Sequence, residues 1–306
     1  MRWIASIGLG LATAVACGGG STAGRVDATI YGEQCEPGGT FHLSGRAGVL
    51  ATLNVHVNAS GLVETDTAAE LLLAMDVEQS GVDVVVVAEP CTLEIPAVPI
   101  AGQDRPIEFD VPEDTLASVG TVTGAATLSS PDRSCAAFES EELTIILGAI
   151  LDPIETAQLP QADEEGGFPF CAPTADTSCG LAIGVNCACD QEGDGRAGAT
   201  VLASNVPAVS LDEVYATMRT RFRLTGEVHS SDLILGEVDP AMELGILGCH
   251  LESGNLCNAD QVGAVKNLNP EITQQPANPS IFRSVRVEPG TTCAYILEHR
   301  DELFPR

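Results

Sequence analysis

Carboxylates alternate with other residues in one short acidic segment of the chain, DQEGDG at positions 190–195. Carboxylate oxygens at the first, third and fifth positions, followed by glycine at the sixth, can wrap a hard cation such as calcium. Val201 stands where an EF-hand carries its bidentate glutamate, and no helical pattern flanks the segment. We therefore predict one of two structures: a calcium loop of another type, with ligands from Asp190, Glu192 and Asp194, or an acidic, glycine-rich turn without a metal.

The acidic segment begins a longer pattern that continues into a predicted strand. The pattern consists of Asp190, Glu192, Asp194, Gly195, Gly198, Ala199, Thr200, Val214, Tyr215, Arg219 and Thr220. It resembles a pattern of uncharacterised bacterial surface lipoproteins, in which proline is commoner at the position of Ala197. The resemblance covers mainly the second half of the chain. It implies an envelope location and a β fold, and no known activity.

A row of arginines is the second group that could do chemistry. Arg219, Arg221 and Arg223 alternate with apolar or small residues, so a strand here would place the three guanidinium groups on one face. Such a face could hold an anionic ligand or partner. The alternative is ordinary pairing with carboxylates on the next strand. The candidates for that pairing are Glu227, Asp232 and Glu237.

The eleven cysteines are an odd set. If Cys17 carries a lipid, an even set remains, and an even set in an exported chain is typical of disulfides. These cysteines are Cys35, Cys91, Cys135, Cys171, Cys179, Cys187, Cys189, Cys249, Cys257 and Cys293. Cys249 and Cys257 are close enough in sequence for a local bridge, and this is the pairing that we predict. The alternative is a metal cluster formed by Cys179, Cys187 and Cys189, although no Cys-x-x-Cys spacing and no nearby histidine supports it.

The N-terminus has the pattern of a bacterial export signal. One positive charge at Arg2 precedes an apolar stretch over residues 4–16, which has the length of a signal-peptide core and is too short to span a membrane. The stretch ends Ala-Val-Ala-Cys and resembles the lipobox of bacterial lipoproteins, although Ala14 stands where leucine is commonest. The resemblance implies that residues 1–16 are removed and that Cys17 becomes a lipid-carrying N-terminus. An ordinary secretory signal is the alternative.

Residues 17–25 are rich in glycine and are predicted to be a flexible tether. Residue 18 is glycine rather than the aspartate that commonly retains lipoproteins at the inner membrane. The resemblance therefore favours an anchor in the outer membrane, with the protein facing the periplasm or the cell surface. The membrane is thus one expected partner, through the lipid.

Composition and motifs exclude several functional classes. The formal net charge is −29, so we expect no binding to nucleic acid through basic patches. Hydrophobic residues make up 44% of the chain, which is enough for a packed core. The sequence has no nucleophile-elbow, zinc-protease or phosphate-loop motif, and its five histidines are scattered. We therefore do not expect an enzyme.

The candidate groups must be positioned by β-structure. Alternating apolar residues predict strands over 49–57, 71–77, 82–86, 107–111 and 214–224, with shorter strands at 233–235 and 246–247. Residues 143–151 are apolar on both faces and predict a buried central strand. Proline and acidic residues in 152–180 predict a linker between an N-terminal half, 26–151, and a C-terminal half, 181–306. Helical spacing occurs only at 293–304, with a cap at Thr291 or Thr292.

The predicted fold is therefore all-β: an antiparallel meander that closes into a lipocalin-like barrel or packs as a sandwich, with a short C-terminal helix. We expect a non-enzymatic binding or envelope-structural module, with a small apolar ligand inside it or a protein partner outside it. Two alternatives stay open. One is a secreted hydrolase whose carboxylates converge in three dimensions. The other is a calcium-dependent adhesive protein.

Overall fold

The computed structural model describes residues 35–59, 63–99, 104–171, 186–206, 209–267, 271–275 and 277–305. The predicted signal peptide, lipobox and tether lie outside these residues, as do Cys17 and Cys179. The elements in chain order are β1 Gly45–Ala59, β2 Val63–Ser80, β3 Asp83–Glu94, β4 Glu108–Asp110, α1 Glu113–Ala117, β5 Val122–Leu128, β6 Ala136–Ser140, β7 Leu143–Leu147, β8 Ala149–Ile150, β9 Cys187–Ala188, β10 Ala199–Ser204, β11 Leu211–Ser230, β12 Leu233–Leu251, α2 Ala259–Asn267, β13 Glu271–Gln274, β14 Ser280–Val287, α3 Cys293–Glu298 and α4 Arg300–Leu303.

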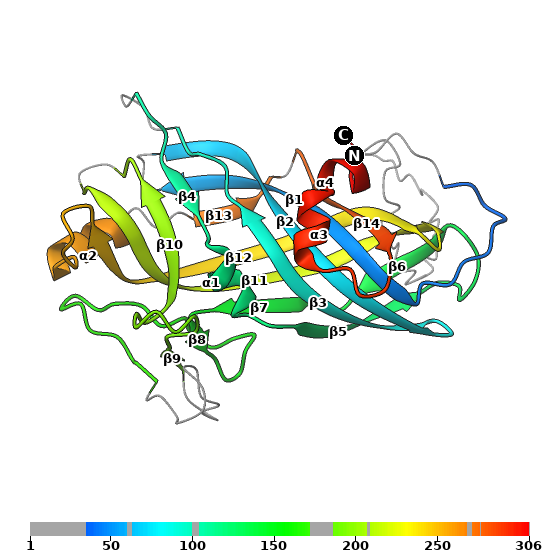
Figure 1. Cartoon of the computed structure of the whole chain (residues 1–306), viewed down its shortest axis with the longest axis horizontal. Coiled ribbons are helices and arrows are strands. Elements are labelled where there is room, and N and C mark those ends of the chain that lie inside the picture. The colour runs from blue at the N-terminus through cyan, green and yellow to red at the C-terminus, as the bar shows by residue number, and fades with distance from the viewer. Residues whose placement is uncertain are drawn as a thin grey trace, which may run out of the picture.

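The strands form one large antiparallel sheet of twelve strands and a small pair, β8–β9 (Figure 1). Neighbours follow the order β12-β14-β1-β2-β3-β5-β6-β11, and β11 also pairs with β12. The hydrogen-bonded path therefore returns to its start, and we call these eight strands the strand ring. Strands from both halves of the sequence belong to it. The prediction of a mainly antiparallel β protein is confirmed.

The long strand β11 organises one side of the ring. Three short strands pair in turn along a single edge of it: β10 with residues 213–216, β7 with residues 218–222 and β6 with residues 225–228. Its other edge pairs with β12 along almost its whole length. The two short strands predicted at 233–235 and 246–247 are thus parts of one strand, β12.

Period-two alternation explains which side chains enter the ring. Val49, Ala51 and Leu53 of β1 are at most 2% exposed, and they lie in the same core cluster as the inward residues of β2 and β3. On the outward face of β1, Thr52, His56 and Asn58 are polar as the pattern predicted, whereas the outward Leu72 and Ala74 of β2 are apolar and buried. The predicted buried strand over 143–151 is wrong in one respect, because it breaks into β7 and β8 at Gly148. Gly148 has φ +68, a left-handed backbone that ends the extended strand, and only glycine fits because a Cβ there would lie 2.4 Å from the amide nitrogen of Ala199.

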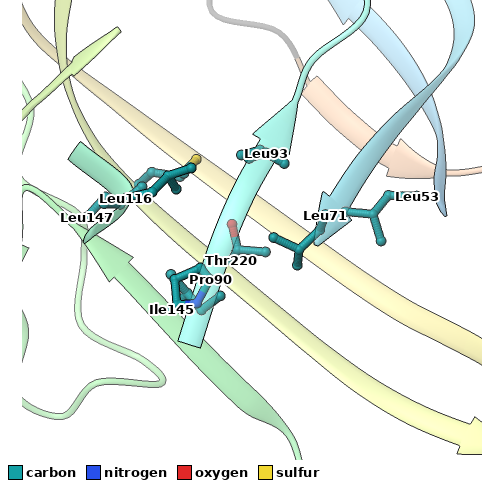
Figure 2. A pocket seen from close by; sticks show the side chains of 9 residues that line it. Leu53, Leu71, Pro90, Leu93, Leu116, Ile145, Leu147 and Thr220 are labelled. Carbon is teal, nitrogen blue, oxygen red and sulfur yellow. The ribbon is translucent and has the colours of Figure 1, made fainter. Parts of the chain in front are cut away.

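The interior of the ring is filled by side chains. Phe138 and Phe282 are each 1% exposed within the main core cluster. Figure 2 shows an apolar pocket where side chains of β1, β2, β3, β7, β11 and α1 meet. Its volume is about 10 Å³, with Leu53, Leu116 and Thr220 among its lining residues. A site of that volume is about the size that one water molecule requires, so this pocket is too small for an apolar ligand.

The C-terminal helices cover the outside of the ring over β2 and β3 (Figure 1). Ile296 is fully buried against the outward side chains of Leu72 and Ala74. The predicted C-terminal helix is confirmed as α3 and α4, and its cap is Thr292, whose hydroxyl accepts a hydrogen bond from the N–H of Tyr295 at 3.4 Å.

Two helices were not predicted, so the expectation that only the C-terminus is helical is wrong. One is α1, a single turn; the other, α2, buries Val262 and Val265. The N-terminus of α2 is a reciprocal capping box: the N–H of Gln261 donates to Asn258 Oδ1 at 3.0 Å, and the N–H of Asn258 donates to Gln261 Oε1 at 2.9 Å. This Asn-x-x-Gln spacing is the sequence signal that could have found the helix. Among the described residues, no helix is long and apolar enough to cross a membrane.

Candidate functional site

The acidic loop is closed by hydrogen bonds from its own backbone to Asp190. One carboxylate oxygen of Asp190 accepts from the N–H groups of Gly193 at 2.7 Å and Asp194 at 3.1 Å. The other accepts from the N–H of Gly195 at 2.9 Å. Gly193 and Gly195 have φ +77 and +85, a left-handed backbone that glycine adopts without steric cost. The glycines therefore let the chain curl around the Asp190 carboxylate.

The other two carboxylates attach the loop to the start of β10. Asp194 accepts from the N–H of Arg196 at 2.7 Å and from the hydroxyl of Thr200 at 2.8 Å. Glu192 accepts from the N–H of Thr200 at 2.6 Å with one oxygen. Its second oxygen is buried and has no hydrogen-bond partner among the described residues. Thr200 therefore fixes the loop to β10, and Gln191 fixes it elsewhere, because its side chain accepts from the N–H of Gly148 at 2.7 Å and donates to the carbonyl of Ser118 at 2.9 Å.

Two more residues of the resemblance pattern, Gly198 and Tyr215, pack at the same junction. Thr200 lies opposite Tyr215 in the β10–β11 register. The guanidinium of Arg196 lies 5.6 Å from the centre of the Tyr215 ring, and the Tyr215 hydroxyl donates to Glu213 at 2.6 Å. Burial of this hydroxyl, reinforced by Glu213, raises the pKa of Tyr215. Gly198 has φ +96, and a Cβ there would lie 2.7 Å from Leu247. The part of the pattern from Asp190 to Tyr215 thus surrounds one loop–sheet junction, whereas Arg219 and Thr220 lie further along β11.

This geometry accounts for the loop as an acidic turn. All its carboxylate oxygens except one of Glu192 accept hydrogen bonds from N–H and O–H groups of the loop and of β10, and a cation at those oxygens would have to share or replace these donors. Among the described residues, the group of three side chains whose possible metal-ligating atoms all lie within 4.8 Å of one another is Cys35, Glu227 and His229. None of these residues belongs to the acidic loop. Calcium at Asp190, Glu192 and Asp194 stays a prediction.

The arginine row is divided by the fold. Arg219 is 4% exposed, and its guanidinium donates to the carbonyls of Ile154 at 3.1 Å and Ala157 at 2.8 Å and also to Glu243. Arg219 therefore fixes the segment after β8 to the sheet, and it is not available to an anion from solution. Sequence alternation placed Arg219 on an open face, but residues 154–157 cover that part of the face.

The other two arginines are half-buried or exposed. Arg221 donates to Glu243 at 2.9 Å and lies 3.9 Å from Glu142. Arg223 is exposed and stands opposite Asp239 in the β11–β12 register. Arg219 and Arg221 therefore show the cross-strand pairing that we gave as the alternative, with Glu243 as the partner in place of Glu227, Asp232 and Glu237.

The disulfides include long-range and local bridges. The bridges whose cysteines are both described are Cys35–Cys135, Cys91–Cys293, Cys171–Cys187 and Cys249–Cys257. Cys189 is disulfide-bonded as well. The predicted Cys249–Cys257 pairing is confirmed. Because Cys187 and Cys189 are both oxidised, the disulfide interpretation replaces the cysteine metal cluster at these two residues.

A shallow polar pocket outside the ring is lined by two carboxylates, those of Asp76 and Glu89. It has a volume of about 230 Å³ and lies beside the Cys91–Cys293 bridge. Asp76 and Glu89 both point at Arg46, with contacts of 2.6 Å and 3.2 Å, and their side chains are 55% and 45% exposed. Both carboxylates are paired with the same cation and open to water. The pocket therefore lacks the buried, unequal carboxylates that acid–base hydrolysis needs.

Comparisons of this chain with protein-family models, with curated proteins and with solved structures give no match.

Proposed function

We propose that the protein is an extracytoplasmic, lipid-tethered β module of the bacterial envelope that acts through its outer surface, as a binding or structural element. The observation that carries this proposal is the filled interior of the strand ring, where the pocket in Figure 2 has a volume of about 10 Å³. A lipocalin-like carrier needs an interior cavity of several hundred Å³. A protein partner on the outer surface is therefore favoured over a small apolar ligand inside.

The proposal includes a finer statement of the fold. We infer that the strand ring is a flattened, closed barrel with a side-chain core. The β11–β12 pairing supports this, because it leaves no free edge between the first and last strands of the path. The Cys35–Cys135 and Cys91–Cys293 bridges span 100 and 202 residues of sequence. They stabilise the fold further because they restrict the conformations of the unfolded chain.

The proposed location is the outer membrane, with Cys17 as the anchor. The disulfides support an oxidising compartment, and the lipobox-like ending supports the lipid. A tether of residues 17–25 would hold an acidic body, of formal net charge −29 for the chain, away from anionic headgroups.

Two measurements test the proposal. Fractionation should find wild type and Ser21→Ala, a tether control, in the membrane pellet, and Cys17→Ser in the soluble fraction. A Cys17→Ser variant that remains in the pellet like wild type would contradict the lipid anchor. An environment-sensitive apolar dye should show no saturable binding to the folded protein, and stoichiometric binding that Leu53→Trp abolishes would contradict the filled interior.

A further inference from the structure

One disulfide lies beside a histidine and a carboxylate. Cys35 is bridged to Cys135. The sulfur of Cys35, a carboxylate oxygen of Glu227 and a ring nitrogen of His229 all lie within 4.8 Å of one another. Glu227 and His229 occupy alternate positions of β11, so they share its outer face, whereas Val228 between them is fully buried. Sulfur, imidazole and carboxylate are the ligand types that proteins use for zinc.

Backbone contacts hold both cysteines at this point of β11. The N–H of Cys135 donates to the Val228 carbonyl at 2.8 Å, and the sulfur of Cys35 lies 3.8 Å from the same oxygen. Ser134 ties the two chain segments together, because its hydroxyl donates to the carbonyl of Glu36 at 2.9 Å and accepts from the N–H of Gly39 at 3.0 Å. None of these hydrogen bonds uses the S–S bond, so they would keep both sulfurs near Glu227 and His229 after the bridge opens.

This bridge is also the most accessible of the four whose cysteines are both described. Both Cys35 and Cys135 are half-buried. In each of the other three bridges at least one cysteine is no more than 5% exposed; these buried cysteines are Cys91, Cys171, Cys187 and Cys249. An attacking thiolate can therefore approach either sulfur of Cys35–Cys135, whereas in each of the other three bridges at most one cysteine is half-buried. We therefore expect Cys35–Cys135 to react first.

We propose that the Cys35–Cys135 bridge masks a zinc site, which forms when a dithiol reductant opens it. In that step two electrons and two protons pass from the dithiol to the two sulfurs, the S–S bond breaks, and the reductant leaves as its own disulfide. Zinc then displaces the two thiol protons, which go to solvent, and neutral His229 and ionised Glu227 complete a set of four ligands. While the bridge is intact, two of the four ligands are missing.

Zinc binding requires small rearrangements of the four side chains. A tetrahedral zinc ion, with bonds of about 2.0 to 2.3 Å, places its ligand atoms about 3.3 to 3.8 Å apart. Three of the four ligand atoms, from Cys35, Glu227 and His229, lie within 4.8 Å of one another, and the sulfur of Cys135 is bonded to that of Cys35 in the oxidised chain. After reduction the two sulfurs would move apart, and rotations of side chains rather than movement of β11 would bring the ligands to these separations. The strongly negative net charge of the chain also favours a divalent cation at its surface.

The test uses the full chain purified in detergent. The protein is reduced in graded steps with a dithiol, the reductant is removed without oxygen, and zinc uptake is measured by competition with a chromophoric chelator. Alkylation and peptide mass analysis identify the bridge that opens. We expect alkylation of Cys35 and Cys135 before any other cysteine, one zinc ion per reduced chain, no such uptake by the oxidised chain, and protection of both cysteines from alkylation by zinc.

A matched pair of variants separates this site from the other cysteines. His229→Gln should weaken zinc binding by the reduced chain at least tenfold. His250→Gln should leave it unchanged, because His250 stands beside the Cys249–Cys257 bridge on β12 and contacts Asp212 at 2.8 Å. Equal affinity in wild type and His229→Gln, or first opening of another bridge, would overturn the proposal. If His229→Gln does not fold, the wild-type alkylation decides: zinc that fails to protect Cys35 and Cys135 overturns it.

Discussion

The interior of the strand ring and the acidic loop are stabilised in different ways. The interior is a large apolar cluster, in which side chains such as Phe138 and Phe282 pack from many strands. The loop depends on a few directional hydrogen bonds to Asp190, Glu192 and Asp194. A close-packed core responds as a unit to a substitution, whereas a loop can open while the rest of the protein stays folded. We therefore expect substitutions in the interior to lower the global free energy of unfolding, and substitutions in the loop to increase local opening.

The largest effect is expected in the ring interior. Phe138→Ala removes a ring that is 1% exposed, so the free energy of unfolding, measured with urea, should fall by about 3–5 kcal/mol. Val85→Ala is the control on the same sheet, because Val85 is 46% exposed. It should cost less than about 1 kcal/mol. Similar losses in the two variants would show that the interior is not the source of global stability.

An intermediate effect is expected where the loop meets β11. Gly198→Ala would place a Cβ 2.7 Å from Leu247 and 2.9 Å from the Ala216 carbonyl, at φ +96. We expect a loss of about 2–3 kcal/mol, together with faster proteolysis within residues 189–200. Gly193→Ala is the matched control, since Gly193 has φ +77 but no atom within 4 Å of a Cβ. It should cost only about 1 kcal/mol, the cost of a left-handed backbone. Equal losses would mean that close packing at Gly198 does not fix the loop.

The smallest effect concerns calcium. If the loop binds the ion with the affinity of extracellular modules, roughly 10⁻⁴–10⁻³ M, a tenfold excess of calcium over Kd adds about 1.4 kcal/mol of stability. The variant Asp190→Asn with Asp194→Asn should lose this increment in a thermal-shift titration. Glu164→Gln with Glu165→Gln, an exposed acidic pair outside the loop, should keep it. Identical responses of wild type and the Asp190/Asp194 variant would leave the loop as an acidic turn.

The strands of the ring could be predicted because their signal is local. Alternation at Val49, Ala51 and Leu53 needs only neighbouring residues, and the structure buries all three. The capping box of α2, from Asn258 to Gln261, was equally local and was missed because the helix that follows has few apolar residues.

The candidate sites depend on contacts between distant residues. Arg219 has the alternation of an outward side chain, yet it is buried because a segment some 60 residues earlier covers it with the carbonyls of Ile154 and Ala157. Likewise, Cys35 reaches Glu227 and His229 through a docked segment and not through any spacing in the sequence. The even number of cysteines that remains without Cys17, in a chain predicted to be exported, indicated disulfides, but only the fold shows which cysteines are paired.

The order of the cysteines has a consequence for how the protein is made. Along the chain, Cys91 lies between Cys35 and its partner Cys135, and the partner of Cys91 is Cys293, near the C-terminus. If the chain is exported as proposed above and is oxidised on the way, Cys35 and Cys91 both emerge before Cys135 and Cys293. A catalyst that joins thiols in order of appearance would then link Cys35 and Cys91 wrongly. Maturation would then depend on a disulfide isomerase, and the outward faces of Leu72 and Ala74 would stay uncovered until the last residues of the chain had crossed the membrane.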